Sequence, residues 1–215
     1  MDYIIIIYSL LSFVFLLLFA KISYKLKLVD LPNERKIHTS EIAFTGGIII
    51  SLIFIVSSLL FDLSNKEFNS ILSMSFLMAI IGLIDDKFNL SVGSKLSLQI
   101  FPIFYLIAFQ DLALHNLGDY FYFEINIQSF TIPITMICAL FLINAFNYFD
   151  GIDGTLSFSS ISVLMILFFL IPDQEFQLFL KIILIPIIIF LCFNFSLFKL
   201  PKMFLGDSGS LLLGF

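Results

Sequence analysis

Charged side chains are scarce in this chain of 215 residues: 13% are Asp, Glu, Lys or Arg, whereas 60% are hydrophobic and the mean hydropathy is +1.09. A water-soluble domain usually contains about a quarter charged residues. Such a domain could not keep this much apolar surface away from water, so the composition excludes an ordinary soluble fold. The lipid bilayer is the solvent that suits the sequence.

Cysteine is also rare, because only Cys138 and Cys192 are present and both lie in apolar runs. Two such residues predict neither a disulfide framework nor a thiolate metal site. The 11 lysines and arginines form no basic stripe, which excludes a nucleic-acid footprint. Repeats, low-complexity linkers and a separate soluble domain are absent as well. We therefore expect one membrane-embedded domain over residues 1–215.

Long apolar runs fill the chain, and a spanning helix needs roughly 20 such residues. The runs predict seven helices, at Tyr3–Ala20, Phe44–Phe61, Phe68–Ile84, Leu96–Gln110, Phe130–Phe146, Leu156–Ile171 and Ile182–Phe198. An eighth run begins near Ser210. The Leu96–Gln110 run is short and contains Pro102. The first run lacks the basic leader of a signal peptide, so we expect it to be a membrane helix too. The predicted fold class is an all-α polytopic membrane protein.

Lysines follow the first apolar run, at Lys21, Lys25 and Lys27. By the positive-inside rule this places the N-terminus outside and the first loop inside. Alternating sides from there puts nine of the 11 basic residues inside and leaves Lys66 and Lys181 outside. One outside segment, Phe121–Gln128, alternates apolar and polar residues, which is typical of a strand. We expect it to belong to a small external β-hairpin near residues 120–130.

Polar residues recur every third position where an apolar run ends, at Asn144, Asn147, Asp150 and Asp153. On a helix end this spacing keeps the side chains close to one face. Two amides and two carboxylates offer oxygen atoms to a cation or to a ligand rich in donors. A polar helix cap is the alternative, although acids at the membrane edge more often mark a functional site.

Two further inside segments have unusual polar residues. Asp85 and Asp86 are adjacent carboxylates, which favour a nearby cation such as Lys95 or a shared proton. The alternative is a solvated pair at the start of a loop. The segment 206–210 reads G-D-S-G-S and opens the last apolar run. A helix N-terminus with free amides favours anions, while Asp207 has the chemistry to hold a divalent ion; an ordinary helix cap is the alternative.

The first inside loop contains Asn33, Arg35, Lys36 and His38. Arginine suits bidentate phosphate recognition, whereas the alternative is the positive charge of any first inside loop. Carboxylates, amides and a glycine-rich turn on one side of the membrane indicate Mg²⁺-assisted phosphoryl chemistry, because Mg²⁺ prefers oxygen ligands. A Zn²⁺ site would use His and Cys, which these segments lack apart from His38.

Taken in order, these motifs resemble those of the polyprenyl-phosphate N-acetylhexosamine-1-phosphate transferases of glycosyltransferase family 4. That group includes the phospho-MurNAc-pentapeptide translocases and the undecaprenyl-phosphate GlcNAc-1-phosphate transferases. The matching segments are 30–38 with Gly46 and Gly47, 82–86 with Lys95, 144–154 and 204–210. The resemblance implies transfer of a sugar 1-phosphate from a UDP-N-acetylhexosamine to undecaprenyl phosphate. UMP is released, and the reaction starts the synthesis of a cell-envelope polysaccharide.

The resemblance also implies roles for individual residues. Mg²⁺, with Mn²⁺ as a substitute, would be held by Asn147 and Asp207. The expected catalytic residues are Asp85, Asp86, Asp150, Asp153 and Asp207. The expected substrate-binding residues are Asn33, Arg35, His38, Lys95, Asn144, Asn194, Gly206, Ser208 and Gly209. Among these, Asn194 corresponds to a residue that contacts uridine, and Lys95 to a lysine near the lipid phosphate.

Membership in this family would further imply a protein of the bacterial inner membrane, surrounded by lipid, whose active site faces the cytoplasm. A homodimer is one form of assembly that the family would imply. Two features depart from the family pattern. Asn89 lies near the position where the family often has a third acidic residue after the pair that corresponds to Asp85 and Asp86. The family's further helices and its histidine-bearing loop correspond to positions beyond Phe215. Two alternatives therefore stay open: an incomplete or non-catalytic family fragment, and a membrane transporter or lipid-binding protein.

Overall fold

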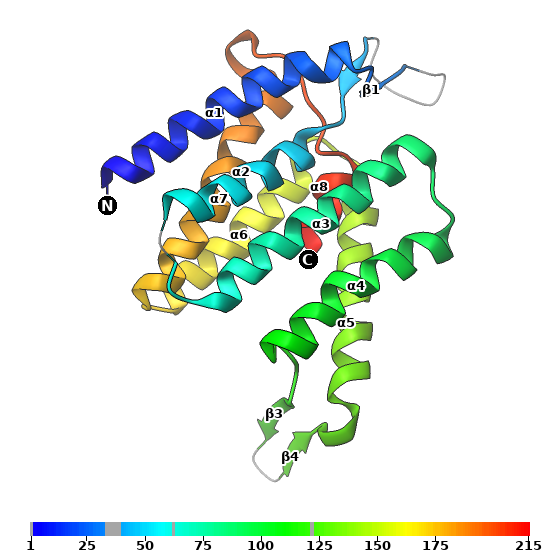
Figure 1. The fold of residues 1–215 in the computed structure, drawn as a ribbon, viewed down its shortest axis with the longest axis vertical. Coiled ribbons are helices and arrows are strands. Elements are labelled where there is room, and N and C mark those ends of the chain that lie inside the picture. Colours follow the sequence, from blue (N-terminus) through cyan, green and yellow to red (C-terminus); the bar gives the residue numbers. More distant parts are fainter. Residues whose placement is uncertain (1, 33–39, 62, 121–122) are drawn as a thin grey trace.

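The computed structural model describes residues 2–32, 40–61, 63–120 and 123–215 (Figure 1). The predicted residues Asn33, Arg35, Lys36 and His38 lie outside the described part of the chain. The helices are α1 (Asp2–Lys25), α2 (Gly46–Leu60), α3 (Lys66–Phe88), α4 (Val92–Gln110), α5 (Thr131–Phe149), α6 (Thr155–Leu170), α7 (Gln174–Asn194) and α8 (Gly206–Gly214), with short 3₁₀ turns at Gln128–Phe130 and Leu197–Lys199.

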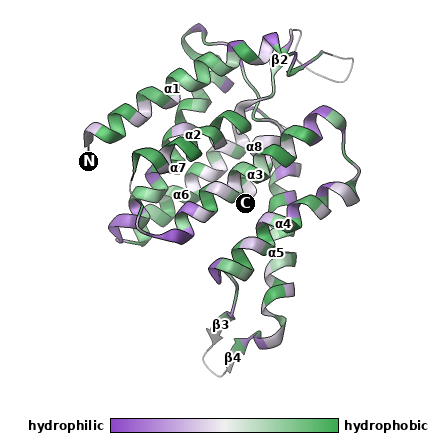
Figure 2. Cartoon of the chain, in the orientation of Figure 1, coloured by the Kyte–Doolittle hydropathy of each residue, from purple (hydrophilic) through white to green (hydrophobic). Residues whose placement is uncertain are grey.

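The polytopic helical fold expected from the sequence is confirmed. Five helices of the described chain, α1, α3, α4, α5 and α7, are long and apolar enough to cross a membrane. The helices α2 and α6 are also apolar but shorter, with 15 and 16 residues. In Figure 2 the helices are mainly hydrophobic, and hydrophilic residues gather at their ends and in the connections. Which side of the membrane each end faces stays a prediction from the charge pattern.

Capping residues explain where several helices begin and end. The side chain of Asn65 accepts a hydrogen bond from the backbone N–H of Glu67 at the start of α3, and Ser91 accepts one from Ser94 at the start of α4. Between these helices, Asn89 caps the end of α3 in a left-handed conformation, with φ at 50°. Asparagine tolerates that conformation better than most residues. The departure from the family pattern at Asn89 therefore has a structural reason.

Two small antiparallel sheets complete the fold. Strand β1 (Val29–Asp30) pairs with β2 (Ile42–Ala43), and β3 (Asn116–Tyr120) pairs with β4 (Phe123–Asn126). The hairpin expected near residues 120–130 is present, but it begins earlier than predicted. The predicted strand Phe121–Gln128 covers only β4 and the start of the following 3₁₀ turn, because the other strand comes from the polar stretch before it.

Helix α8 lies at the centre of the bundle beside α3, whereas α4 and α5 run away from it toward the β3–β4 hairpin (Figure 1). Backbone hydrogen bonds fix the entry to α8. The N–H of Phe204 donates to the carbonyl of Ala43 at 2.7 Å, and the N–H of Gly46 donates to the carbonyl of Phe204 at 3.0 Å. The segment before α8 is therefore held by the start of α2, about 160 residues earlier in the chain.

Glycines let α2 and α3 approach α8 at backbone distance. A Cβ added to Gly47 would lie 2.0 Å from the backbone nitrogen of Gly209, and one added to Gly82 would lie 2.3 Å from the carbonyl oxygen of Asp207. Neither position has room for a side chain, since real Cβ contacts are not that short. Two glycines on different helices thus determine where the first turn of α8 is placed.

Several helix boundaries differ from the predicted runs, most of all at α7, which begins at Gln174 and not at Ile182. Two boundaries concern the candidate site. Helix α8 begins at Gly206, so the polar segment 206–210 is its first turn, as expected for a helix N-terminus, although the apolar run itself was predicted to begin near Ser210. Helix α5 ends at Phe149, so Asn144 and Asn147 are helical, whereas Asp150 and Asp153 lie in the connection to α6. The expectation that all four share one helix face was wrong, because Gly151 and Gly154 allow the chain to turn there.

Candidate active site

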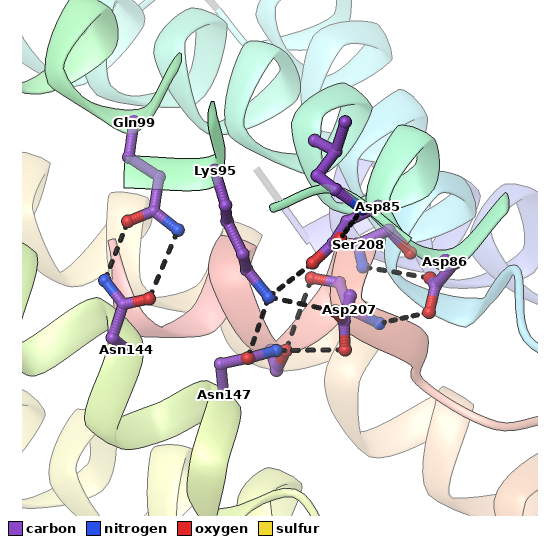
Figure 3. Close-up of polar contacts among 10 residues, drawn as sticks. Asp85, Asp86, Lys95, Gln99, Asn144, Asn147, Asp207 and Ser208 are labelled. Atoms are coloured by element: carbon purple, nitrogen blue, oxygen red, sulfur yellow. Dashed lines mark hydrogen bonds and ion pairs between the residues drawn. The ribbon is translucent and has the colours of Figure 1, made fainter. Parts of the chain in front are cut away.

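The amino group of Lys95 is the centre of a polar cluster formed by α3, α4, α5 and α8 (Figure 3). Its Nζ lies 2.6 Å from Oδ2 of Asp85, 2.9 Å from Oδ2 of Asp207 and 2.9 Å from Oδ1 of Asn147. The Lys95 side chain is only 13% exposed. A largely buried cation is stable there because two carboxylates and an amide oxygen surround it.

Asn147 joins α5 to α8 on the other side of the cluster. Its Nδ2 donates to Oδ1 of Asp207 at 3.0 Å and to the hydroxyl of Ser210 at 2.7 Å, while its Oδ1 accepts from Lys95. Every polar atom of this amide therefore has a partner. The arrangement fixes the orientation of Asn147 and turns its oxygen toward the ammonium group.

Asp86 caps the N-terminus of α8 from the end of α3. Its Oδ1 accepts the backbone N–H of Asp207 at 3.1 Å, and its Oδ2 accepts that of Ser208 at 3.4 Å. Gly206, the residue before Asp207, has a φ of +72°, and a Cβ added to it would lie 2.2 Å from the carbonyl oxygen of Phe44. The amides that the sequence suggested for a phosphate thus already bind a carboxylate of the protein itself.

A cavity of about 400 Å³ opens beside this cluster. Five carboxylates line it, those of Asp30, Asp86, Asp150, Asp153 and Asp207. The described residues of the lining include no lysine or arginine. A volume of this size suits a small-molecule ligand, and an anionic ligand would need a cation to enter with it.

Two of the lining carboxylates differ in their surroundings. Burial, followed by repulsion from the carboxylates of Asp207 and Asp153, raises the pKa of Asp150 to about 6. Asp153 instead forms an ion pair with Lys202, whose Nζ lies 2.7 Å from its Oδ2. The charge of Asp150 therefore changes near neutral pH, in a cavity that is already acidic.

Asn194, at the end of α7, presents an unpaired acceptor. Its Nδ2 donates to the carbonyl of Met203 at 3.0 Å, whereas its Oδ1 is buried and has no hydrogen-bond partner among the described residues. Asn194 also lines the cavity. A buried acceptor without a partner is unfavourable, so this oxygen is suited to an N–H or O–H group of a ligand.

The structure brings most of the predicted residues together. Asp85, Asp86, Lys95, Asn147 and Asp207 form the polar cluster, and Asp150, Asp153, Asn194 and Gly206 line the cavity beside it. Two predicted residues serve packing: the hydroxyl of Ser208 is buried and donates to the carbonyl of Leu205 at 3.3 Å, and the backbone of Gly209 lies against Gly47. Asn144 lies in the helical turn before Asn147 and does not line the cavity.

Two residues of this region were missed by the sequence analysis. Gln99 lies in a mainly apolar run, four residues after Lys95, and it forms hydrogen bonds with Asn144. That spacing was the available signal, because residues four apart share a helix face. Lys202 forms the ion pair with Asp153, but no local sequence pattern connects residues 49 positions apart.

The oxygen atoms of Asn147 and Asp207 have the chemistry that Mg²⁺ prefers, and both already lie against a cation, the ammonium group of Lys95. Within the described residues there is no group of three or more His, Cys, Asp or Glu side chains placed to hold a metal ion. Mg²⁺ is usually bound by one or two carboxylates together with substrate phosphates. The residues present therefore fit a site that the substrate completes.

Comparison with known proteins gives a consistent assignment. The family model described as Glycosyl transferase family 4 matches residues 68–215. The chain is 32% identical over 211 residues to the undecaprenyl-phosphate alpha-N-acetylglucosaminyl 1-phosphate transferase of Yersinia pestis, covering 96% of this chain and 58% of that protein. It is 31% identical over 209 residues to the protein of the same name from Escherichia coli K12, covering 94% of this chain and 56% of the relative.

A relative with lower sequence identity has a similar name. The probable undecaprenyl-phosphate N-acetylglucosaminyl 1-phosphate transferase of Bacillus subtilis is 28% identical over 199 residues, covering 91% of this chain and 55% of that protein. The chain thus spans a little more than half the length of the relatives it matches. The family match over residues 68–215 includes the residues of the polar cluster on all four helices.

Proposed function

Because the chain belongs to glycosyl transferase family 4, we propose that it transfers a sugar 1-phosphate from a UDP-sugar to undecaprenyl phosphate and releases UMP. The names of the relatives specify N-acetylglucosamine 1-phosphate and undecaprenyl phosphate. The observation that most directly supports this proposal is the meeting of Lys95, Asn147 and Asp207 beside an acidic cavity. Such a site favours a phosphate substrate that arrives with a divalent cation.

In this proposal the cavity of about 400 Å³ binds the UDP-sugar. The unpaired Oδ1 of Asn194 accepts a hydrogen bond from the uracil ring, which has an N–H donor. Asn147 and Asp207 would hold Mg²⁺, which when bound would supply positive charge to offset the charge of the diphosphate. The specificity for a particular hexosamine is not assigned to any residue of the chain.

Lys95 provides positive charge where the lipid phosphate meets the donor. An oxygen of undecaprenyl phosphate attacks the β-phosphorus of the UDP-sugar, and the bond from that phosphorus to the bridging oxygen breaks, so UMP leaves with the electron pair. A phosphate monoester has its second pKa near 6, so at neutral pH the attacking oxygen is already largely ionised. Positioning and charge neutralisation, rather than proton removal, are then the main contributions of the protein.

The charge pattern of the sequence supports an active site on the cytoplasmic face of a bacterial inner membrane, since nine of 11 basic residues fall on the same side as the polar cluster. The cluster lies at helix ends and not midway along the apolar helices: Asp85 and Asp86 are in the last turn of α3 and Lys95 is in the first turn of α4. This location suits a lipid phosphate at the membrane surface. It argues against a transporter, whose charged residues lie near the bilayer midplane.

The proposal is tested by UMP release from UDP-N-acetylglucosamine in membranes that contain the protein and undecaprenyl phosphate. Wild-type protein should release UMP only with Mg²⁺ or Mn²⁺, and chelation should abolish the release. The variants Asp207→Asn and Asn147→Ala should each lose activity by about 100-fold or more. Asp111→Asn is the matched control, because Asp111 follows the far end of α4 and its side chain is 90% exposed.

Three results would contradict the proposal. They are normal turnover in Asp207→Asn and Asn147→Ala, turnover that is indifferent to chelation, and transport of a lipid or ion without UMP release. The last of these would favour the transporter alternative. Loss of activity in Asp111→Asn to the same extent would show that the effect is not specific to the site.

A further inference from the structure

A pair of amide side chains joins α4 to α5 next to the polar cluster. Asn144 Nδ2 donates to Oε1 of Gln99 at 2.7 Å, and Gln99 Nε2 donates back to Oδ1 of Asn144 at 3.5 Å. Gln99 is fully buried. Figure 3 shows the two amides facing each other beside the contact between Lys95 and Asn147. The two helices are therefore connected by two successive polar contacts.

The spacing on each helix relates these contacts. Gln99 follows Lys95 by four residues on α4, and Asn144 precedes Asn147 by three residues on α5, so each pair shares one helix face. The helices are antiparallel, since the earlier residue of α4 meets the later residue of α5. A shift of α5 along α4 would therefore change both contacts together.

Apolar side chains also contribute to the packing of these two helices. Ile103 and Ile107 of α4 pack against Ile143 of α5 in an apolar cluster. Apolar contacts are non-directional and tolerate sliding. A reciprocal amide pair is directional, and a buried amide that loses its partner is destabilised. In a membrane, hydrogen bonds between helices are among the interactions that specify their packing.

On the basis of the proposed function, we infer that Gln99 is a positioning residue. Its amide pair with Asn144 sets the register of α4 against α5. In that register the side chain of Lys95 contacts Asn147 and Asp207. The family resemblance implied substrate contact for Asn144. In the structure both hydrogens of its Nδ2 are in use, one toward Gln99 and one toward the carbonyl of Leu140 at 2.8 Å. Asn144 thus acts through Gln99 and not on the substrate.

This inference predicts a particular kinetic effect. Misplacement of a reacting or charge-neutralising group by about 1 Å can reduce a rate by about 100-fold. Substrate binding in the cavity does not depend on the amide pair, because neither Gln99 nor Asn144 lines it. Loss of the pair should therefore lower kcat and leave KM for the UDP-sugar nearly unchanged.

The test exchanges the two amides between the helices. Gln99→Asn shortens one side of the pair, Asn144→Gln lengthens the other, and the double variant restores the combined length. We expect each single variant to lower kcat for UMP release by about tenfold or more with KM for the UDP-sugar within about twofold of wild type. The double variant should recover most of the lost kcat. Each single variant should lower the melting temperature of the purified protein by a few degrees, because a buried amide loses its partner, and the double variant should recover it.

Thr135→Val is the matched control. Thr135 of α5 accepts a hydrogen bond from the N–H of Leu114, in the segment after α4, at 2.9 Å. The substitution removes a polar link between the same two regions at the end of α5 that is remote from Lys95, so kcat should not change.

Several results would overturn the inference. One is a double variant no faster than the slower single variant, and another is single variants with wild-type kcat. A changed KM that accounts for the whole loss would show direct substrate contact, and an equal loss of kcat in Thr135→Val would show a general packing role. Wild-type protein that releases no UMP refutes the proposed function and the inference with it; wild-type turnover with unrescued variants refutes the inference alone.

Discussion

Lys95 of α4 and Asp207 of α8 form an ion pair of 2.9 Å although they are 112 residues apart in the chain. Asp85 joins the same ammonium group at 2.6 Å, so one cation holds two carboxylates together. Two carboxylates this close would repel each other without it. Lys95 therefore organises the site before any substrate binds.

Replacing Lys95 with methionine keeps the length of the side chain and removes its charge. The carboxylates of Asp85 and Asp207 then repel each other, and the substrate phosphates lose a counter-charge. We expect Lys95→Met to reduce the rate of UMP release by about 100-fold or more. Lys87→Met is the control, because Lys87 is exposed in the last turn of α3. Turnover of Lys95→Met equal to that of the control would contradict this role.

Adding one methyl group at Gly47 should displace α8. The new Cβ would lie 2.0 Å from the backbone nitrogen of Gly209 and 2.1 Å from its Cα, and neither backbone atom can move aside easily. We expect Gly47→Ala to lower the melting temperature by several degrees, about 1–3 kcal/mol of overpacking, and to reduce activity by misplacing Asp207. Thermal unfolding and UMP release measure the two effects.

Gly93 provides the matched control for that substitution. It lies in the first turn of α4, and a Cβ there would have no atom within 4 Å. Alanine favours helix more than glycine does, so Gly93→Ala should leave activity unchanged and the melting temperature equal or slightly higher. If Gly47→Ala behaved in the same way, close packing of α2 on α8 would not determine the site.

The raised pKa of Asp150 predicts a stability effect with a defined sign. Its ordinary value is 3.8 and its value in the folded protein is about 6, so the folded state binds the proton more tightly than the unfolded chain does. Ionised Asp150 therefore destabilises the fold, and stability falls as the pH rises from about 4 to about 6. Asp150→Asn should raise the melting temperature near pH 8 by roughly 2–6 °C and have little effect near pH 4.

Asp153→Asn is the control for this pH effect. Asp153 lies in the same connection but is paired with Lys202 at 2.7 Å, so its replacement removes an attraction instead of a repulsion. We expect no gain in melting temperature near pH 8. A gain of the same size in both variants would mean that general negative charge, and not the environment of Asp150, is responsible.

Asn194 should affect the nucleotide donor alone. Asn194 lines the cavity and its Oδ1 has no partner among the described residues, and Asn194→Leu keeps the approximate shape while removing that acceptor. We expect KM for the UDP-sugar to rise about tenfold, as for the loss of one buried hydrogen bond, while KM for undecaprenyl phosphate stays the same. Equal changes in both KM values would indicate a distorted site and contradict a specific contact.

Much of the fold and part of the site could be predicted from the sequence. Apolar run length predicts membrane helices because the bilayer thickness sets the number of residues needed. The polar segments at 85–86, 144–153 and 206–210 stand out because burying charge in lipid is unfavourable, so they mark a site by contrast with their surroundings. The family follows from these motifs and is confirmed by the match over residues 68–215.

The partners of the polar residues were decided only by the tertiary structure. No local sequence pattern shows that Asp86 accepts hydrogen bonds from the backbone amides of Asp207 and Ser208, or that Gln99 pairs with Asn144. These contacts depend on how closely α2 and α3 approach α8 and on the register of α4 against α5. The sequence by itself determined which residues are polar in an apolar chain, since that is a property of composition. Helix packing decided which of them meet, because a hydrogen bond depends on the positions of two atoms that the chain brings together only when it folds.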